Sequence, residues 1–433
     1  MLVSSFLSAA LAATATLAAP QQIPLGATSS APSRLASLIS PTLGSAFGKL
    51  ESTLAALPVE HLVQLEEHVN SLSDKRLVQF EEDGEQFEIT EGAKALLTLL
   101  DKHFVDVTDD NADMVWTTTP EYKYPSTLSH NAKELKSLFK LISIEEMKAF
   151  IAKFSSFFNR YYRSNYGLES QQYLLSHLKS LHKQYNPSAN ITFREFKHSS
   201  WDQKSIIVRW APSPSSRSED DTAAANAPPV ILSAHQDSTN SLPFLRAPGA
   251  DDDGSGTTAL VQAFTALLKA GGAPTTHPVE LHLYSAEEGG LLGSGEVARS
   301  YMGEGKQIRA MYHMDVVAYV KPGTKPVVGL ITDGVNDNLT DFMELLINEY
   351  AQIPVARTRC GYACSDHGSW TKTGSPSACL SEGRFEDSNP NMHSSSDVFD
   401  RPEYSFEHIE QFVRIALGYI TELAGFEVKK EKA

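Results

Sequence analysis

The chain of 433 residues has little cysteine, fewer basic than acidic residues, and only one long apolar run. Three cysteines are too few for a disulfide framework, which excludes the small disulfide-stapled folds. Lys and Arg number 37 against 53 Asp and Glu, and a net charge of -16 argues against nucleic acid or an anionic membrane as a partner. Beyond the first 19 residues no apolar run reaches the roughly 20 residues of a membrane helix. We therefore expect no membrane anchor.

The one apolar run lies at the amino end. Residues 1–19 combine an apolar centre with the small-residue ending Leu17-Ala18-Ala19, which is typical of a cleaved signal peptide, although no Lys or Arg precedes it. Glycosylation acceptors at Asn190 and Asn338 agree with export, as do Cys360 and Cys364, which are close enough in sequence to pair in an oxidising compartment. We predict a secreted, extracellular protein.

Changes in composition divide the rest of the chain. From about residue 20 to 55 it is rich in Ala, Ser, Pro and Gly without sustained periodicity, as in a linker. From 60 to about 107 Leu and Val recur at helical spacing, which predicts a small helical and hairpin module. A break at 116–120 precedes a second apolar-periodic region, from Phe150 to Leu181. We interpret residues 20–112 as a propeptide and residues 113–433 as the catalytic domain.

Beyond Tyr185 β-rich runs alternate with helical runs, a pattern typical of an α/β fold with largely parallel strands. A helix is predicted over Thr257–Ala270, because its apolar residues share one face and Gly271-Gly272 follows. The predicted strands are Ser205–Trp210, Val230–Ser233, Glu280–Tyr284 and Arg309–Met314. We expect a mixed, mostly parallel central sheet flanked by helices, with residues 212–229 as an exposed loop.

Polar side chains follow the ends of these strands, where open α/β sheets bind ligands. His235 and Asp237 come directly after the second strand, and their spacing puts both on the same side of an extended chain. Adjacent glutamates follow the third strand at Glu287 and Glu288, where one can bind a metal while the other acts as a general base. Asp315 follows the fourth strand. The ends of successive strands therefore carry candidate metal ligands.

Three adjacent acids, Asp251, Asp252 and Asp253, lie between glycines just before the predicted helix. A cation would remove their mutual repulsion, and the glycines let the backbone bend close to it. Mixed His and carboxylate ligands suit zinc, with cobalt or manganese as alternatives, and a carboxylate commonly bridges two metals about 3.5–4 Å apart. Spacing alone does not distinguish the three acids, and a late histidine, His393, joins the set only because of the others.

Together these motifs resemble peptidase family M28, the zinc aminopeptidases, and most of all the secreted fungal leucine aminopeptidases. The resemblance runs from about Tyr122 to about Phe426. It implies a zinc-exopeptidase (phosphorylase/hydrolase-like) fold, peptide substrates with a free amino end and an apolar, Leu-like first residue, and a cleaved signal peptide and propeptide. The matching motifs are residues 157–162 (Phe-Phe-Asn-Arg-Tyr-Tyr), 235–237, 249–256, 285–295, 360–367 and 393–397.

The resemblance also implies the ligands of two zinc ions. His235 and Asp315 would bind one zinc, and Glu288 and His393 would bind the other. Asp252 would bridge the two, a choice that rests on alignment to the family motif. This chain has Met-Asp-Val at 314–316 where the family often has Leu-Asp-Met, a difference that bears on the shape of the specificity pocket.

Catalytic roles follow from the same resemblance. Asp237 would orient the first histidine ligand, and Glu287 would be the general base that takes a proton from the attacking water and passes it to the leaving amine. Tyr362 would help to stabilise the oxyanion and shape the apolar pocket, held between Cys360 and Cys364 of the implied disulfide.

Several alternatives stay open at the level of sequence. His313 points the same way as Asp315 in an extended strand, and we place it beside the ligands rather than among them. A carboxypeptidase, a single-zinc glutaminyl cyclase and an inactive binding module are the competing functions, and the complete set of ligands and base argues against the last two. The propeptide would be a partner of the catalytic domain as inhibitor, chaperone or both, and we expect a monomer.

Overall fold

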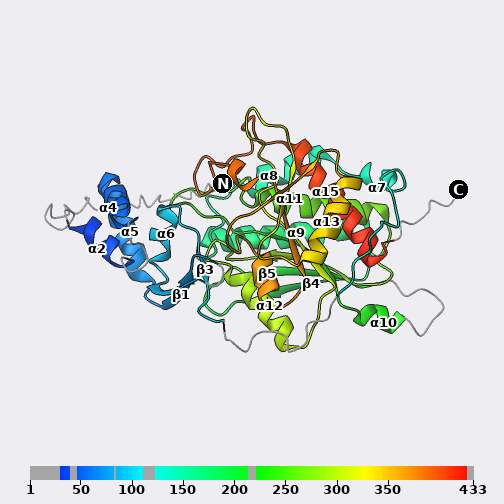
Figure 1. The fold of residues 1–433 in the computed structure, drawn as a ribbon, viewed down its shortest axis with the longest axis horizontal. Coiled ribbons are helices and arrows are strands. Elements are labelled where there is room, and N and C mark those ends of the chain that lie inside the picture. The colour runs from blue at the N-terminus through cyan, green and yellow to red at the C-terminus, as the bar shows by residue number, and fades with distance from the viewer. Residues whose placement is uncertain (1–29, 40–45, 82–83, 111–121, 213–220, 427–433) are drawn as a thin grey trace, which may run out of the picture.

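The computed structural model describes residues 30–39, 46–81, 84–110, 122–212 and 221–426. The predicted signal peptide and the break at 116–120 lie outside these ranges. Figure 1 shows the first helices, in blue, as a small group beside a larger body that holds the rest of the chain. None of the helices within the described ranges is both long and apolar enough to cross a membrane.

An eight-stranded sheet forms the centre of the larger body, in the order β10-β9-β11-β8-β6-β7-β5-β4. The neighbours β11, β8, β6 and β7 are parallel, whereas β5 and β4 pair antiparallel at one edge and β9 runs antiparallel to β11. The predicted fold class and its four strands are confirmed, and four further strands were not predicted. The strands are β4 Ile191–Phe196, β5 Ser205–Trp210, β6 Val230–His235, β7 Val279–Tyr284, β8 Ala310–Met314, β9 Val328–Ile331, β10 Val355–Thr358 and β11 Ser377–Ser381.

Helices cover both faces of this sheet because alternate strand residues point to opposite sides. Leu232 of β6 packs in the larger core with α11 and α15, whereas its neighbour Ile231 packs with α12 and α14. Asp253 caps the amino end of α11, and Gly271 ends that helix in the left-handed conformation. The helices are α7 Lys136–Phe139, α8 Ile144–Phe154, α9 Asn165–Tyr185, α11 Gly254–Ala270, α12 Leu292–Gly303, α13 Asp337–Tyr350, α14 His367–Lys372 and α15 Phe406–Ala424.

Two expectations for the catalytic region need correction. The apolar region from Phe150 to Leu181 is not continuous, because α8 ends at Phe154 and Ser164 caps a new helix by accepting the Gly167 N–H. The loop of residues 155–164 between these helices carries the aromatic motif, whose apolar side chains recur at a helical spacing although the segment is not a helix. The stretch of residues 212–229 is not wholly loop, since α10 (Asp221–Asn226) lies within it.

The N-terminal module, defined as the described residues between 30 and 110, has a hydrophobic core of its own. The interpretation of residues 20–55 as a linker is wrong in part, because Leu35, Leu50 and Leu54 of two short helices are buried in that core. Helices of only seven and ten residues leave little periodicity to detect. The elements are α2 Ala31–Ser37, α4 Phe47–Ala56, α5 Val59–Ser71, β1 Lys75–Gln79, β2 Gln86–Thr90, α6 Lys94–Leu99 and β3 Val105–Asp106, and the strands form an antiparallel sheet in the order β2-β1-β3.

Candidate metal centre and substrate cavity

His235, the last residue of β6, is completely buried at the carboxyl edge of the sheet. Its Nδ1 lies 3.5 Å from Asp237 Oδ1, and its Nε2 lies 3.2 Å from Asp252 Oδ1 and 3.4 Å from Asp315 Oδ1. Burial opposes protonation of this ring, but Asp315 and the other carboxylates outweigh it and raise the pKa of His235 well above its usual value. One imidazole is thus surrounded by three carboxylates.

Asp252 lies between the two candidate histidine ligands. While its Oδ1 faces His235, its Oδ2 lies 3.2 Å from Nε2 of His393. Burial would raise the pKa of this carboxyl, but the two histidines outweigh burial and hold it far below its usual value. One oxygen toward each histidine is the arrangement that a bridging carboxylate requires.

The neighbours of Asp252 face other groups. The Asp253 oxygens accept the main-chain N–H groups of His235, Gly256 and Val316 at 3.1, 2.8 and 3.2 Å. Asp251 accepts the Ala318 N–H and an amide N–H of Asn389, each at 3.0 Å. The structure therefore distinguishes three acids that spacing could not.

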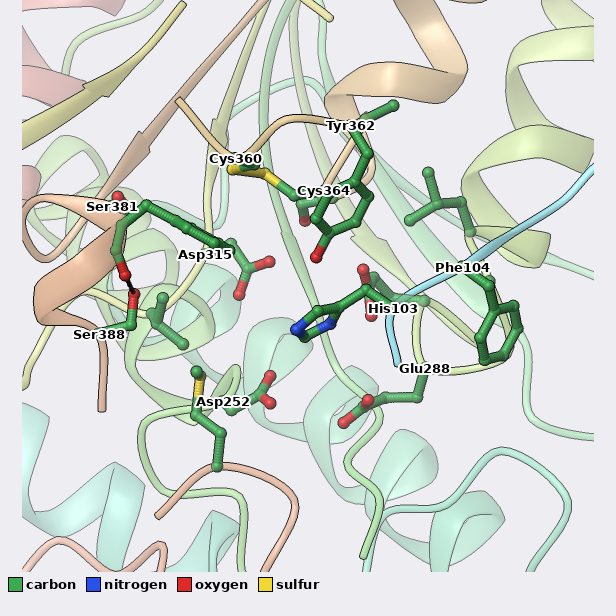
Figure 2. A pocket seen from close by; sticks show the side chains of 18 of the residues that line it. His103, Phe104, Asp252, Glu288, Asp315, Cys360, Tyr362, Cys364, Ser381 and Ser388 are labelled. Carbon is green, nitrogen blue, oxygen red and sulfur yellow. Dashed lines mark hydrogen bonds between the residues drawn. A yellow bond between two sulfur atoms is a disulfide. The ribbon is translucent and has the colours of Figure 1, made fainter. Parts of the chain in front are cut away.

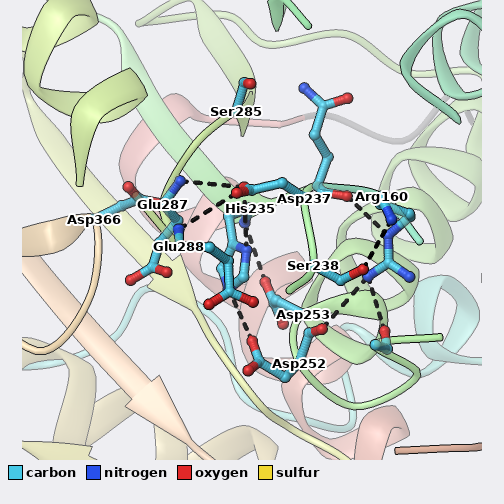
Figure 3. A network of polar contacts seen from close by, with 12 residues as sticks. Arg160, His235, Asp237, Ser238, Asp252, Asp253, Ser285, Glu287, Glu288 and Asp366 are labelled. Atoms are coloured by element: carbon cyan, nitrogen blue, oxygen red, sulfur yellow. Dashed lines mark hydrogen bonds and ion pairs between the residues drawn. The ribbon is translucent and has the colours of Figure 1, made fainter. Parts of the chain in front are cut away.

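The second half of the centre comes from the turn after β7 and from a late loop. His393 Nε2 lies 3.0 Å from Glu288 Oε2, and Glu288 Oε1 accepts the Thr239 N–H at 2.9 Å. Figure 3 shows Asp237 joined to the same turn, where its two oxygens accept the N–H groups of Glu287 and Glu288 at 3.1 and 3.3 Å. Asp237 thus links both halves of the centre.

Two groups of side chains within the described residues have ligand atoms within 4.8 Å of one another: His235 with Asp253 and Asp315, and Asp252 with Glu288 and His393. Asp252 is more available to a cation than Asp253, because both Asp253 oxygens already accept main-chain N–H groups. Neither ring nitrogen of His235 has a hydrogen-bond partner of good geometry among the described residues. Buried nitrogens that face carboxylates without bonding to them fit a cation between them.

Glu287 lines the same cavity as these ligands. Burial, together with the nearby charges of Asp315 and Asp366, raises the pKa of Glu287 well above its usual value, although His235 opposes the shift. A carboxylate of raised pKa accepts a proton more readily near neutral pH, which suits a general base.

The cavity opens over the metal centre, as Figure 2 shows. Tyr362 projects into it from the loop closed by the disulfide between Cys360 and Cys364, and the predicted pairing of these cysteines is present. The apolar residues that line the cavity include Val316, Ile331, Cys379, Phe385 and Met392. The structure therefore brings a metal centre, a candidate base and an apolar wall to one place.

A segment of the N-terminal module also enters this cavity. His103 stacks on Tyr362 with ring centroids 5.4 Å apart, and Figure 2 places its ring among Asp252, Glu288 and Asp315. Phe104 and the preceding residues line the same opening, although His103 as a whole residue is exposed. Nothing in the sequence around His103 had indicated this position.

A buried charge network attaches the module beside the centre. Glu91 pairs with Arg163 at 3.0 Å and accepts the Tyr162 hydroxyl at 2.8 Å, both in the catalytic region. Lys94 pairs with Glu91 at 2.9 Å and donates to the Gly289 carbonyl, directly after Glu288. These contacts fix the module against the turn that carries Glu287 and Glu288.

Other site residues had only weak signals in the sequence. Arg160 lies in the aromatic motif of residues 157–162, but the sequence predicted no role for it. The structure places it completely buried behind the centre. Asp366, in the motif after Tyr362, is buried, and burial raises its pKa to about 8. His313 is bonded to Ser233 and Ser365 Oγ at 2.9 and 2.8 Å, beside the ligands rather than among them.

Comparisons with a family model, with known sequences and with solved structures agree with one another. A model of peptidase family M28 matches residues 218–417. Leucine aminopeptidase 1 of Metarhizium robertsii is 40% identical over 303 residues, which cover 68% of this chain and 73% of that protein. Leucine aminopeptidase 1 of Trichoderma harzianum is 38% identical over 355 residues, covering 79% and 85%. The LapA aminopeptidase of Legionella pneumophila shares the fold, with a TM-score of 0.68 and 24% identity over 83% of this chain and all of that one.

Proposed function

Because this chain belongs to peptidase family M28 and is a metallo-aminopeptidase, we propose that it is a secreted enzyme that binds two zinc ions and removes apolar, Leu-like residues from the amino end of peptides. The position of Asp252, with one oxygen toward each of two histidines, carries the two-metal part of the proposal. Nitrogen and oxygen ligands together suit zinc.

In this proposal His235 and Asp315 would hold one zinc, Glu288 and His393 would hold the other, and Asp252 would be a ligand shared between them. The distances of 3.0–3.4 Å among these ligand atoms support this division. Bound zinc would supply Lewis-acid polarisation of the scissile carbonyl and lower the pKa of a water. Asp237 holds the Glu287–Glu288 turn in place through its two oxygens and would orient the His235 ring, whose Nδ1 lies 3.5 Å from its Oδ1.

Glu287 takes a proton from the attacking water and passes it to the leaving amine. Its raised pKa keeps the proton affinity of the carboxylate high enough for both transfers. Tyr362 faces the same space and donates its hydroxyl to the developing oxyanion. Burial and the nearby Glu287 charge raise the pKa of Tyr362 well above its usual value, so its proton stays available.

The preferred substrate follows from the walls of the cavity. Ile331, Phe385 and Met392 offer an apolar surface for the first side chain. The carboxylates of the centre attract a free α-ammonium group, which places the first peptide bond, and no later one, beside Glu287. A peptide with a blocked amine loses this attraction.

Hydrolysis of leucine-p-nitroanilide by the processed protein tests the proposal, with the N-acetylated substrate, a chelator and a zinc count run in parallel. We expect cleavage of the free-amine substrate alone, and loss of activity when about two zinc ions are removed. Cleavage of the acetylated substrate would favour a carboxypeptidase or another exopeptidase. Absence of any cleavage with two zinc ions bound would favour an inactive binding module.

Export and processing complete the proposal: residues 1–19 are a signal peptide, residues 20–112 a propeptide, and residues 113–433 the mature monomeric enzyme. The apolar leader, the Cys360–Cys364 disulfide and the exposed side chains of Asn190 and Asn338 support export. The entry of His103 into the cavity supports an inhibitory propeptide. Amino-terminal sequencing of protein from the culture medium tests both cleavages.

A further inference from the structure

The loop of residues 155–164 carries a guanidinium group that is buried behind the metal centre. Arg160 is 0% exposed, and burial lowers its pKa although nearby aspartates, Asp397 first among them, oppose the shift. Its guanidinium packs on the Phe154 ring, 4.3 Å from the ring centroid. Burial of a cation lowers the stability of the fold unless hydrogen bonds replace those that it made to water. The hydrogen-bond partners of the Arg160 guanidinium therefore indicate its role.

Those partners are main-chain carbonyls of two different loops, as Figure 3 shows. Arg160 Nε donates to the Gln236 carbonyl at 2.8 Å, within the loop after β6. Its Nη1 donates to the Pro248 carbonyl, and its Nη2 donates to the carbonyls of Gly249 at 2.8 Å and Asp252 at 3.5 Å, within the loop before α11. One planar group therefore joins the two loops.

One loop begins directly after His235 and the other carries Asp252, and His235 Nε2 lies 3.2 Å from Asp252 Oδ1. We propose that Arg160 is a positioning residue that holds the two loops at the separation at which His235 and Asp252 can share one metal ion, and so sets the affinity of the centre for metal. This inference rests on the two-metal function proposed above.

Further contacts near the guanidinium also link the loop after β6 to the loop before α11. The Arg160 N–H donates to Ser238 Oγ at 3.0 Å, and that hydroxyl donates to the Ala247 carbonyl at 2.9 Å. At Gly249, whose φ is 50°, a Cβ atom would come within 2.4 Å of Ser238 Cβ in the other loop and 2.9 Å of Arg160 Nη2. The two loops therefore approach each other too closely for a side chain at Gly249.

Only arginine can make this set of contacts. Its fork presents N–H groups in fixed directions and reaches several carbonyls at once, whereas a lysine ammonium group is a single point at the end of a flexible chain. A lysine here would keep the charge but bind one loop at a time. Charge alone is therefore not what the position requires.

The test is metal binding by the full-length chain, stripped with chelator and titrated with Zn²⁺ or Co²⁺ in competition with a chromophoric chelator. In Arg160→Met and Arg160→Lys we expect affinity to fall by about 10- to 100-fold, the usual effect of losing an outer-shell partner. The visible absorption of bound Co²⁺, which reports ligand geometry, should change as well. Ser238→Ala, which removes one hydrogen-bonded link, should shift affinity in the same direction by less.

Arg414→Met is the matched control, because Arg414 also donates to a carbonyl, that of Tyr350 at 2.8 Å, and packs on a phenylalanine ring, but lies on α15. We expect it to alter thermal stability without altering metal affinity or the cobalt spectrum. Unchanged affinity and spectrum in Arg160→Lys and Ser238→Ala, or an equal loss in Arg414→Met, would overturn the proposal. A wild-type chain that fails to bind two ions would instead refute the two-metal function itself.

Discussion

At Asp251, Asp252 and Asp253, identical side chains take different tasks because the backbone turns each toward different neighbours. Asp252 faces two histidines, whereas Asp253 caps α11 and Asp251 binds Asn389. The role of each aspartate depends on the groups that its oxygens face. The same substitution should therefore have a different effect on metal binding at each of the three positions.

Asp252→Asn should weaken the binding of both metal ions. The loss should exceed the roughly 10- to 100-fold that follows when a residue that only supports a metal ligand is removed. Competition with a chromophoric chelator measures this. Asp251→Asn is the control, because its oxygens face Ala318 and Asn389 rather than the histidines, and it should retain both ions. Retention of two ions by Asp252→Asn would remove Asp252 as the bridge.

Glu287→Gln should lower kcat by about 10²- to 10⁴-fold, the usual contribution of a general base, while two zinc ions stay bound. The amide cannot accept the proton, but its shape preserves the turn held by Asp237. Steady-state kinetics with a parallel metal count check this prediction. Full activity in the variant would exclude Glu287 as the base.

At the scale of elements, the centre is built by parallel strands that end at the same edge of the sheet. β6 ends at His235, Asp315 directly follows β8, and Glu288 lies in the turn after β7, while the loop before α11 carries Asp252, the proposed bridge. A further element, the segment from α6 to β3, reaches the centre from the N-terminal module and brings His103 onto Tyr362.

Removal of the module should raise kcat/KM for leucine-p-nitroanilide by at least about tenfold, which corresponds to about 1.4 kcal/mol of lost contact. His103→Ala in the unprocessed chain should give part of that increase, because Tyr362 is freed. His61→Ala, which alters a module residue beside Phe244, should give none. Equal activity of the processed and unprocessed chains would show that the segment does not inhibit.

At the scale of the whole molecule, the hydrophobic core of the N-terminal module meets the catalytic region beside a buried charge network. The module core also takes in Leu242 of the catalytic region, and Glu91 joins Lys94 of the module to Arg163. Burial would raise the pKa of Glu91, but Lys94 and Arg163 outweigh burial and lower it from 4.5 to about 2. This carboxylate therefore stabilises the unprocessed chain above pH 4.5, and the contribution is lost as pH falls toward about 2.

Glu91→Gln should lower the free energy of unfolding of the unprocessed chain by about 3 kcal/mol at neutral pH, because it breaks a buried ion pair. The difference from wild type should shrink as pH falls from about 4.5 to about 2. Chemical denaturation at several pH values measures both effects. Glu88→Gln, in an exposed pair with Lys75, should leave the free energy of unfolding nearly unchanged at every pH tested. A pH-independent difference for Glu91→Gln would contradict the assigned pKa.

The sequence by itself determined the fold class and four neighbouring strands of the sheet, because hydrophobic patterns and strand ends are local features, and its resemblance to a known family supplied the set of candidate ligands. It also indicated an N-terminal module, although the two short helices in its first part were missed. Only the tertiary structure decided which aspartate faces both histidines, that Arg160 joins the two ligand loops, and that His103 enters the cavity. The positions of Arg160 and His103 depend on contacts between residues more than 70 positions apart, and the choice of aspartate depends on the direction in which a loop turns one side chain. A local sequence pattern predicts neither.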